Sequence, residues 1–332
     1  MTERRYDPVS GEWRTFAPQR QDRTFLPSVS SCPLCPTRKP NAPTEIPWPS
    51  FDVAVFDNRF PALTADPVDP DVAAIGPYAV EPACGATEVV VYSDDHHASL
   101  GTLGAARIRL VVDVWAERYA ALSVRPDVAY VFIFENRGQE IGVTLHDPHG
   151  QIYAYPEVPP LPARELRVAR EHLDRHGTCV LCDVVGAERA DGARVVVRNE
   201  SFLAYVPFAA RFPYEVHVVA ERHVTSLLDM RDSERDLLAD MLERLLRSYD
   251  TLFGFPLPYV MSLHQAPADD GESLLTSHLH FEFTPIHRSA SRLKYLAGSE
   301  IGAGSFLNDV PPEAAASELR AAVRRHSTSA AD

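Results

Sequence analysis

The sequence predicts an α+β protein made of two copies of one unit, each an antiparallel sheet with covering helices. Three observations support this prediction. A Cys-x-x-Cys pair occurs once in each half, at Cys32 and Cys35 and again at Cys179 and Cys182. In each half a β-branched run ends near a histidine, and a long amphipathic segment follows it. Because the matching elements keep the same order, we expect a first unit at 1–165 and a second at 166–332.

Composition limits the classes of function that fit the chain. A length of 332 residues with 45% hydrophobic and 23% charged residues is ordinary for a globular protein with two domain-sized halves. The net charge of −14 disfavours a nucleic-acid polymer as partner, because phosphate backbones require clustered Lys and Arg. A small nucleotide needs only a local pocket. There is no apolar run of ~18 residues and no signal-peptide core, so we expect a cytoplasmic protein without membrane contact.

The elements of the first half follow from residue patterns. Alternation and β-branched content predict its strands, at 13–17, 51–56, 87–92, 130–135 and 151–155. Apolar residues at the helical period predict a helix at 102–122. The strand at 87–92 leads to His96, and the strand at 130–135 leads toward Asn136, Gly142 and Thr144. These two strand ends are therefore expected to lie near the same site.

The second half repeats this order. The matched pairs are 53–58 with 195–200, His96 with His223, Tyr130 with Tyr259, Asp147 with His278, and His149 with His280. The second amphipathic helix is expected at 233–252. Pro148 and Gly150 of the first copy are replaced by Leu279 and Phe281. We therefore expect the second copy to be catalytically silent.

The repeat also predicts two metal sites. Each copy offers two cysteines, a histidine at a strand end, and a residue two positions before another histidine. Two thiolates with two imidazoles, or with one imidazole and one carboxylate, form a tetrahedral zinc set, and four protein ligands make such a site structural. The predicted sets are Cys32, Cys35, His96 and Asp147 in the first copy, and Cys179, Cys182, His223 and His278 in the second.

Residues 144–156 concentrate the side chains that could carry out a reaction. His149 lies between Pro148, which stiffens the backbone, and Gly150, which lets the backbone approach a ligand closely. A rigidly held imidazole suits a nucleophile, because histidine forms covalent intermediates when it is oriented toward its target. A single histidine at a strand end is more often a structural residue, so the surrounding motif decides the interpretation.

This stretch, together with Phe134-Glu135-Asn136-Arg137-Gly138, resembles the active-site segment of the galactose-1-phosphate uridylyltransferases, a family of the histidine-triad superfamily. The family pattern is His-Pro-His-Gly-Gln, whereas this chain has Asp147-Pro148-His149-Gly150-Gln151. The nucleophile and Gln151 are kept, but Asp147 replaces a metal-binding histidine. The resemblance extends from about Tyr6 to about Arg320 and implies two tandem histidine-triad-like units.

The resemblance implies transfer of UMP between UDP-glucose and galactose-1-phosphate, a step of galactose metabolism, through a uridylyl-histidine at His149 with Gln151 as second catalytic residue. It also implies a homodimer with UDP-glucose and hexose-1-phosphates as its binding partners. The implied substrate-binding residues are Arg20, Arg23, Asn58, Phe60, Asn136, Gly142, Thr144, Lys294 and Glu300.

Three alternatives stay open at this point. Some family members bind iron at a second site, and the matching residues are Glu165, His264, His278 and His280. Since His278 belongs to both sets, the two metals cannot share it, and the second cysteine pair favours zinc. The chain could instead be an adenylyltransferase, another nucleotidyltransferase or a phosphorylase acting on another sugar phosphate. Asp147 leaves room for an inactive, metal-stabilised binding protein.

Overall fold

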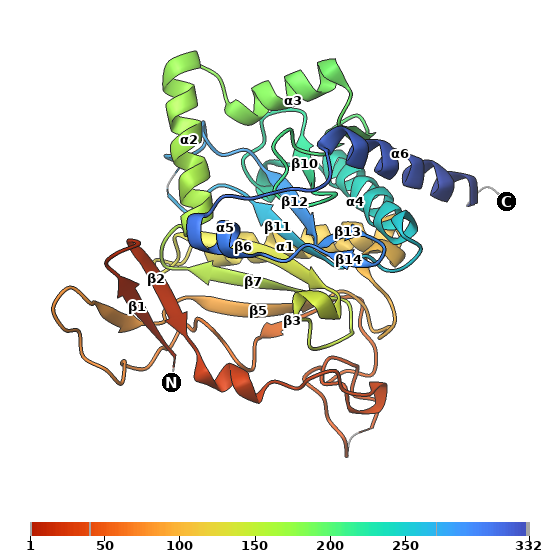
Figure 1. Ribbon diagram of the computed structural model, residues 1–332. Coiled ribbons are helices and arrows are strands. Elements are labelled where there is room, and N and C mark those ends of the chain that lie inside the picture. Colours follow the sequence, from red (N-terminus) through yellow and green to blue (C-terminus); the bar gives the residue numbers. More distant parts are fainter. Residues whose placement is uncertain (1, 40, 270, 330–332) are drawn as a thin grey trace.

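A single antiparallel sheet of nine strands runs through the structure, a computed structural model that describes residues 2–39, 41–269 and 271–329 (Figure 1). The strand order is β3-β5-β7-β6-β11-β12-β10-β9-β8. The first half supplies β3 (Ala54–Asp57), β5 (Ala86–Val91), β6 (Tyr130–Arg137) and β7 (His149–Tyr155). The second half supplies β8 (Val195–Arg198), β9 (Phe202–Tyr205), β10 (Val216–Ala220), β11 (Tyr259–His264) and β12 (His280–Pro285).

Smaller elements lie at the margins of this sheet. A three-stranded sheet contains β1 (Glu3–Asp7), β2 (Glu12–Phe16) and β4 (Val80–Pro82), and a hairpin contains β13 (His287–Ser289) and β14 (Arg292–Leu293). The short 3-10 helices are η1 (Pro18–Asp22), η2 (Val29–Ser31), η3 (Leu100–Thr102), η4 (Gln139–Ile141) and η5 (Leu227–Asp229). The N-terminal strands and η1 lie together at the lower left of the view in Figure 1.

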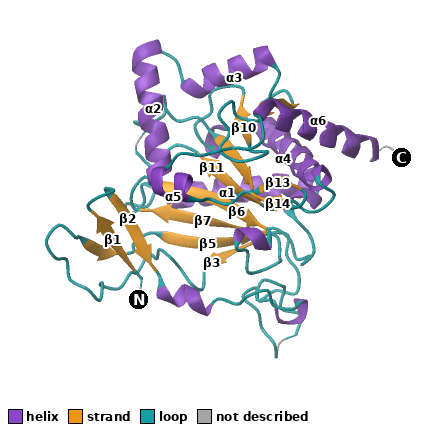
Figure 2. Ribbon diagram, viewed as in Figure 1, coloured by secondary structure: helices purple, strands orange, loops and turns teal. Residues whose placement is uncertain are grey.

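The long helices cover the sheet and close its core. They are α1 (Ala105–Ser123), α4 (Asp232–Leu252) and α6 (Pro312–Ser329), and α4 packs against both of the others (Figure 2). Their apolar faces bury residues such as Trp115 and Leu242 against the strands, which removes apolar surface from water. The remaining helices are α2 (Pro160–His176), α3 (Val180–Asp191) and α5 (Gly298–Ala303). Within the described part of the chain, no helix is both long and apolar enough to cross a bilayer.

The predicted α+β class, with antiparallel strands and covering helices, is confirmed. The strands of the two halves are not separate sheets, because β6 pairs with β11 and joins them edge to edge. In each half the strand that starts at the expected nucleophile position, β7 or β12, is the second strand from this joint. The joint places His149 and His280 on one continuous sheet.

One matched pair from the sequence is wrong. The strand β3 lies beside β5, and the strand in the same place beside β10 is β9, not β8. Residues 53–58 therefore correspond to the region of β9, and β8 is an additional edge strand of the second half. The sequence pattern misled the comparison because 53–58 and 195–200 are both short β-branched runs that end at an asparagine, and an edge strand alternates as an inner strand does.

Candidate active site and metal sites

His149 is the first residue of β7, and its ring is held by the chain segment that precedes the strand. The Nδ1–H group donates to the main-chain carbonyl of Asp147 at 2.7 Å. This bond selects the tautomer in which Nε2 carries the lone pair. Burial lowers the pKa of His149, so the ring stays neutral at neutral pH. His149 therefore has the protonation state and the fixed orientation of a nucleophile.

Several predicted site residues gather around this ring. One cavity is lined by His149, Gln151, Arg23, Asn58, Phe60 and Thr144, together with the cysteine-loop residues Pro33 and Leu34. The Asn58 amide nitrogen lies 3.5 Å from the Gln151 side-chain oxygen, and the Asn58 oxygen accepts from the Phe60 backbone N–H at 2.9 Å. The cavity thus offers amide groups, a guanidinium and an aromatic ring beside the imidazole.

Two arginines give this region positive charge in an otherwise acidic protein. Arg20 donates to the Tyr153 hydroxyl at 2.8 Å, and Tyr153 lies on β7 two residues after Gln151. Burial and the nearby charge of Arg20 lower the pKa of Arg23. Two guanidinium groups held so close together repel one another, and a bound phosphate would relieve that repulsion. Tyr153 was missed in the sequence because its aromatic position in a strand has no distinctive motif.

Other implied substrate residues lie elsewhere. Asn136 lines a neighbouring cavity that also reaches His149, whereas Gly142 ends η4 with φ +85° and lines neither cavity. Lys294 and Glu300 bind each other, with Nζ and Oε1 2.9 Å apart, and this bond lowers the pKa of Glu300 to about 2. Neither of them lines the cavities around His149. The structure therefore does not bring this pair to the nucleophile of the same chain.

The first predicted metal set comes together at the base of the nucleophile loop. One ligand atom from each of Cys32, Cys35, His96 and Asp147 lies within 4.8 Å of the others. Asp147 lies 2.6 Å from the Cys32 sulfur and 3.0 Å from His96 Nδ1, and Cys35 lies 3.4 Å from that nitrogen. Burial and the Asp147 carboxylate raise the pKa of Cys35 to about 11. A buried carboxylate beside one buried and one partly buried sulfur is a donor set that a cation would compensate.

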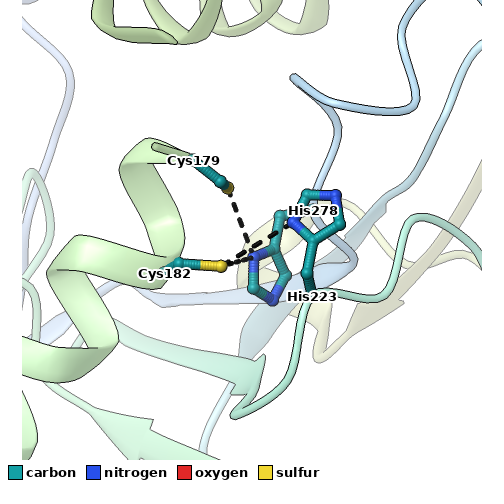
Figure 3. Close-up of side chains that lie close together, drawn as sticks. All are labelled: Cys179, Cys182, His223 and His278. Carbon is teal, nitrogen blue, oxygen red and sulfur yellow. Dashed lines mark hydrogen bonds between the residues drawn. The ribbon is translucent and has the colours of Figure 1, made fainter. Parts of the chain in front are cut away.

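The second set converges in the same way (Figure 3). The Nδ1 atom of His278 lies 3.6 Å from the sulfurs of both Cys179 and Cys182, and Nδ1 of His223 lies 3.7 Å from Cys182. Ligand atoms 2.0–2.3 Å from a tetrahedral centre would be ~3.5 Å apart, which agrees with this spacing. His278 Nε2 donates to the Ala220 carbonyl at 2.9 Å, which leaves Nδ1 for a metal. Both clusters can hold a metal ion.

The alternative second site is divided by the fold. Glu165, His264 and His280 form a cluster of their own, in which His264 Nδ1 lies 2.7 Å from the Glu165 carboxylate. Both ring nitrogens of His278 are directed elsewhere, to the cysteines and to Ala220. The structure therefore groups His278 with the sulfur ligands and leaves three residues of the alternative set together.

A third cavity, of about 310 Å³, lies beside His280. It is lined by Glu165 and Glu282, and Glu282 accepts from Arg211 at 2.6 Å and lies 3.3 Å from His217. Burial raises the pKa of Glu282, but the positive groups around it lower that pKa to about 2. The repeat that pairs His149 with His280 also pairs Gln151 with Glu282, two residues further along in each half, but it does not indicate the network formed with Glu215, His217 and Arg211.

Comparison with known proteins agrees with this geometry. Residues 1–159 match the family model of the galactose-1-phosphate uridyl transferase N-terminal domain, and residues 165–331 match that of the C-terminal domain. The chain is 38% identical to the galactose-1-phosphate uridylyltransferase of Thermotoga maritima, covering 96% of this chain and 98% of the relative. It is 39% identical to the enzyme of that name from Streptomyces lividans, with coverage of 96% and 86%. A solved uridylyltransferase structure superposes with a TM-score of 0.87 at 36% identity, covering 97% of this chain and 99% of the other. The chain therefore belongs to the galactose-1-phosphate uridylyltransferase family.

Proposed function

We propose that this protein transfers UMP between UDP-glucose and galactose-1-phosphate through a covalent uridylyl group on His149. The observation that carries the proposal is the His149 ring, which is neutral, held by the Asp147 carbonyl and placed in the wall of a cavity with Gln151 and Arg23. Family relatives that match almost the whole chain carry the same name for this activity.

The chemistry divides into two displacements at one phosphorus atom. Nε2 of His149 attacks the α-phosphorus of UDP-glucose, the bond from phosphorus to the bridging oxygen breaks, and glucose-1-phosphate leaves as an anion. Galactose-1-phosphate then attacks the uridylyl-histidine, the phosphorus–nitrogen bond breaks, and UDP-galactose forms. This order produces ping-pong kinetics. Gln151, Thr144 and the arginines supply donors that stabilise charge on the phosphoryl oxygens during both steps.

The two ligand sets are assigned to zinc in this proposal. In each set two cysteines combine with nitrogen or oxygen donors in a closed group of four, a pattern typical of structural zinc. In the second set the proposal favours zinc over iron, because His278 contacts the cysteines rather than Glu165. A zinc ion in the first set would brace the loop that carries His149, through Asp147 two residues earlier.

We also propose that the protein is a cytoplasmic homodimer. Each chain of the dimer consists of two units, 1–165 and 166–332. The segment that carries Lys294 and Glu300 exposes Tyr295, Ile301 and Leu307, of which 76%, 75% and 63% remain accessible. Such side chains are typical of a protein interface. Because Lys294 and Glu300 do not line their own chain's cavities at His149, a contribution to a partner's site would explain why the resemblance places them among the substrate-binding residues.

Label exchange between UDP-glucose and radioactive glucose-1-phosphate tests the proposed function. Exchange without galactose-1-phosphate is expected only if a uridylyl-enzyme forms. Intact-mass analysis after incubation with UDP-glucose should show one UMP on His149, and incubation with ADP-glucose should show no adduct. An AMP adduct would favour an adenylyltransferase, and no adduct with either nucleotide would favour an inactive binding protein.

A further inference from the structure

The two halves differ in a group of side chains that pack against the strands beginning at the two equivalent histidines, β7 at His149 and β12 at His280. In the pairing register, His149 lies opposite Val91 and His280 lies opposite Val219, so the next residues, Tyr92 and Ala220, occupy equivalent places. The residues that follow the two histidines, Gly150 and Phe281, are equivalent as well. The first half therefore has a large residue at the first position and glycine at the second, whereas the second half has a small residue at the first position and phenylalanine at the second.

The same register places a carboxylate in only one of the two halves. Phe134 lies opposite Gln151, and Ser262 lies opposite Glu282, so the residues after them, Glu135 and Leu263, are equivalent. Glu135 is 4% exposed and Leu263 is fully buried. The active half therefore has a tyrosine, a glutamate and a glycine where the second half has an alanine, a leucine and a phenylalanine.

The tyrosine and the glycine are in direct contact. A Cβ atom added to Gly150 would lie 2.0 Å from the Tyr92 hydroxyl oxygen, so no larger residue fits there while Tyr92 keeps its place. Tyr92 also holds the chain on the other side of His149, because its backbone N–H donates to the Pro148 carbonyl at 2.8 Å. Tyr92 thus contacts the residues immediately before and after the nucleophile.

The carboxyl group of Glu135 lies beside the Tyr92 hydroxyl. Its Oε1 atom accepts from the Tyr259 hydroxyl at 3.1 Å, and the Tyr92 hydroxyl interacts with the same carboxyl group. Within the described residues, neither the Tyr92 hydroxyl nor Glu135 Oε2 has a hydrogen-bond partner. Burial raises the pKa of Glu135 to about 7, and Arg137 opposes that rise. Keeping a carboxyl group at this depth is unfavourable for folding.

The second half shows that the fold does not need these polar groups. Phe281 packs against Trp115 with ring centroids 6.3 Å apart, and Tyr92 packs against the same ring at 6.0 Å. Apolar residues therefore fill the equivalent place without a buried carboxylate. We propose, on the basis of the function proposed above, that Tyr92 and Glu135 are positioning residues that hold the backbone of residues 148–150 so that Nε2 of His149 stays in line with phosphorus.

The decisive experiment transplants the second half's residues into the first. The double variant Tyr92→Ala/Gly150→Phe restores the packed volume but removes the hydroxyl contact. We expect single-turnover formation of the uridylyl-enzyme from UDP-glucose to slow by about 100-fold, because misplacing a reacting atom by ~1 Å has an effect of this size. Affinity for UMP should stay within about threefold, since neither Tyr92 nor Gly150 lines the cavity formed with Gln151, Asn58 and Phe60.

Single variants keep the test decisive if the double variant does not fold. Glu135→Leu should raise the melting temperature and yet slow uridylylation by about 10-fold, whereas Glu135→Gln should retain most of the rate. A residue with a merely structural role would not change stability and rate in opposite directions. Tyr92→Phe should slow the same step, and the matched control Tyr119→Phe, which removes a buried hydroxyl bonded to the Ala266 carbonyl, should not.

The outcome separates this inference from the proposed function. If the unmodified protein forms no uridylyl-histidine, the proposed function fails. If it does form the adduct but Tyr92→Phe and Glu135→Leu react at the unmodified rate, the positioning roles are overturned while the function stands.

Discussion

The first and second halves place histidines at equivalent positions of one sheet but surround them with different chemistry. Both rings donate Nδ1–H to a carbonyl two residues earlier, at 2.7 Å for His149 and 2.8 Å for His280. Beside His149, Gln151 lies opposite Val89, whereas beside His280, Glu282 lies opposite His217. An uncharged amide tolerates a phosphate nearby, and a carboxylate repels it. Ring orientation alone therefore does not make a nucleotidyl transfer site.

The largest expected effect distinguishes the two histidines directly. His149→Ala should reduce label exchange by more than about 10³-fold, because it removes the imidazole that the proposal assigns as the nucleophile. His280→Ala should leave exchange within about threefold if the second half is silent. Exchange assays with purified variants measure both effects. Retained exchange in His149→Ala would remove the covalent mechanism, and circular dichroism should show that the variant stays folded.

Changing the amide to the second half's carboxylate should have the next largest effect. Gln151→Glu places a negative charge where the phosphoryl oxygens develop theirs, so we expect uridylylation to slow by about 100-fold. The matched change Glu282→Gln leaves Arg211 and His217 with one fewer charged partner and should alter stability, not exchange. Equal loss of exchange in the two variants would contradict the separation of roles between the halves.

Metal content distinguishes the two alternative ligand sets of the second half, the cysteine set and the Glu165 set. Cys179→Ser should lower bound zinc from two ions to one and destabilise the fold by about 4 kcal/mol, as expected for loss of a structural metal. Cys32→Ser should also remove one zinc ion, but it should slow uridylylation as well, because the first set adjoins the His149 loop. Elemental analysis of the purified variants is the measurement. Unchanged metal in Cys179→Ser together with bound iron would favour the Glu165, His264 and His280 cluster.

Stability should depend on pH through Glu135, which has no ionisable counterpart in the second half. Its folded-state pKa is raised by burial from 4.5 to about 7, so the folded state binds the proton more tightly than the unfolded state. The stabilisation that results from this tighter proton binding is therefore fully present below pH ~4.5 and is lost as the pH rises through about 7. The loss lowers the free energy of unfolding by about 3 kcal/mol. Denaturant titrations from pH 5 to pH 8 should show a smaller fall in Glu135→Leu. An equal fall in both proteins would contradict this assignment.

The smallest effect is expected at Asp147, whose counterpart in the second half is His278. Its carboxylate already lies among the other three ligand atoms, so a metal can use either residue type. Asp147→His should keep or raise activity, by no more than about threefold, and should slow the loss of zinc to a chelator. Activity and zinc release can be followed in one time course. A fall in both activity and metal content would assign Asp147 another role.

The elements that were predicted well are those with strong local patterns. The helices α1 and α4 and the strands β5, β6 and β7 follow from apolar periodicity within single segments. The ligand-type residues were recognised because the same short motifs occur twice. One assignment that depended on neighbours in space failed, because β9 rather than β8 takes the place of β3. The substrate-binding role of Lys294 and Glu300 stays a prediction.

By itself, the sequence determined the fold class, the repeat, the family resemblance and the residue types at both candidate metal sets, because each is written in short motifs or local periodicity. Only the tertiary structure decided that two sets of strands form one sheet, that His278 lies with the cysteines, and that Tyr92 and Glu135 lie beneath Gly150. These features depend on strand register and on contacts between distant segments. Register is set by which faces are buried together, and one chain's local pattern does not specify its distant partner.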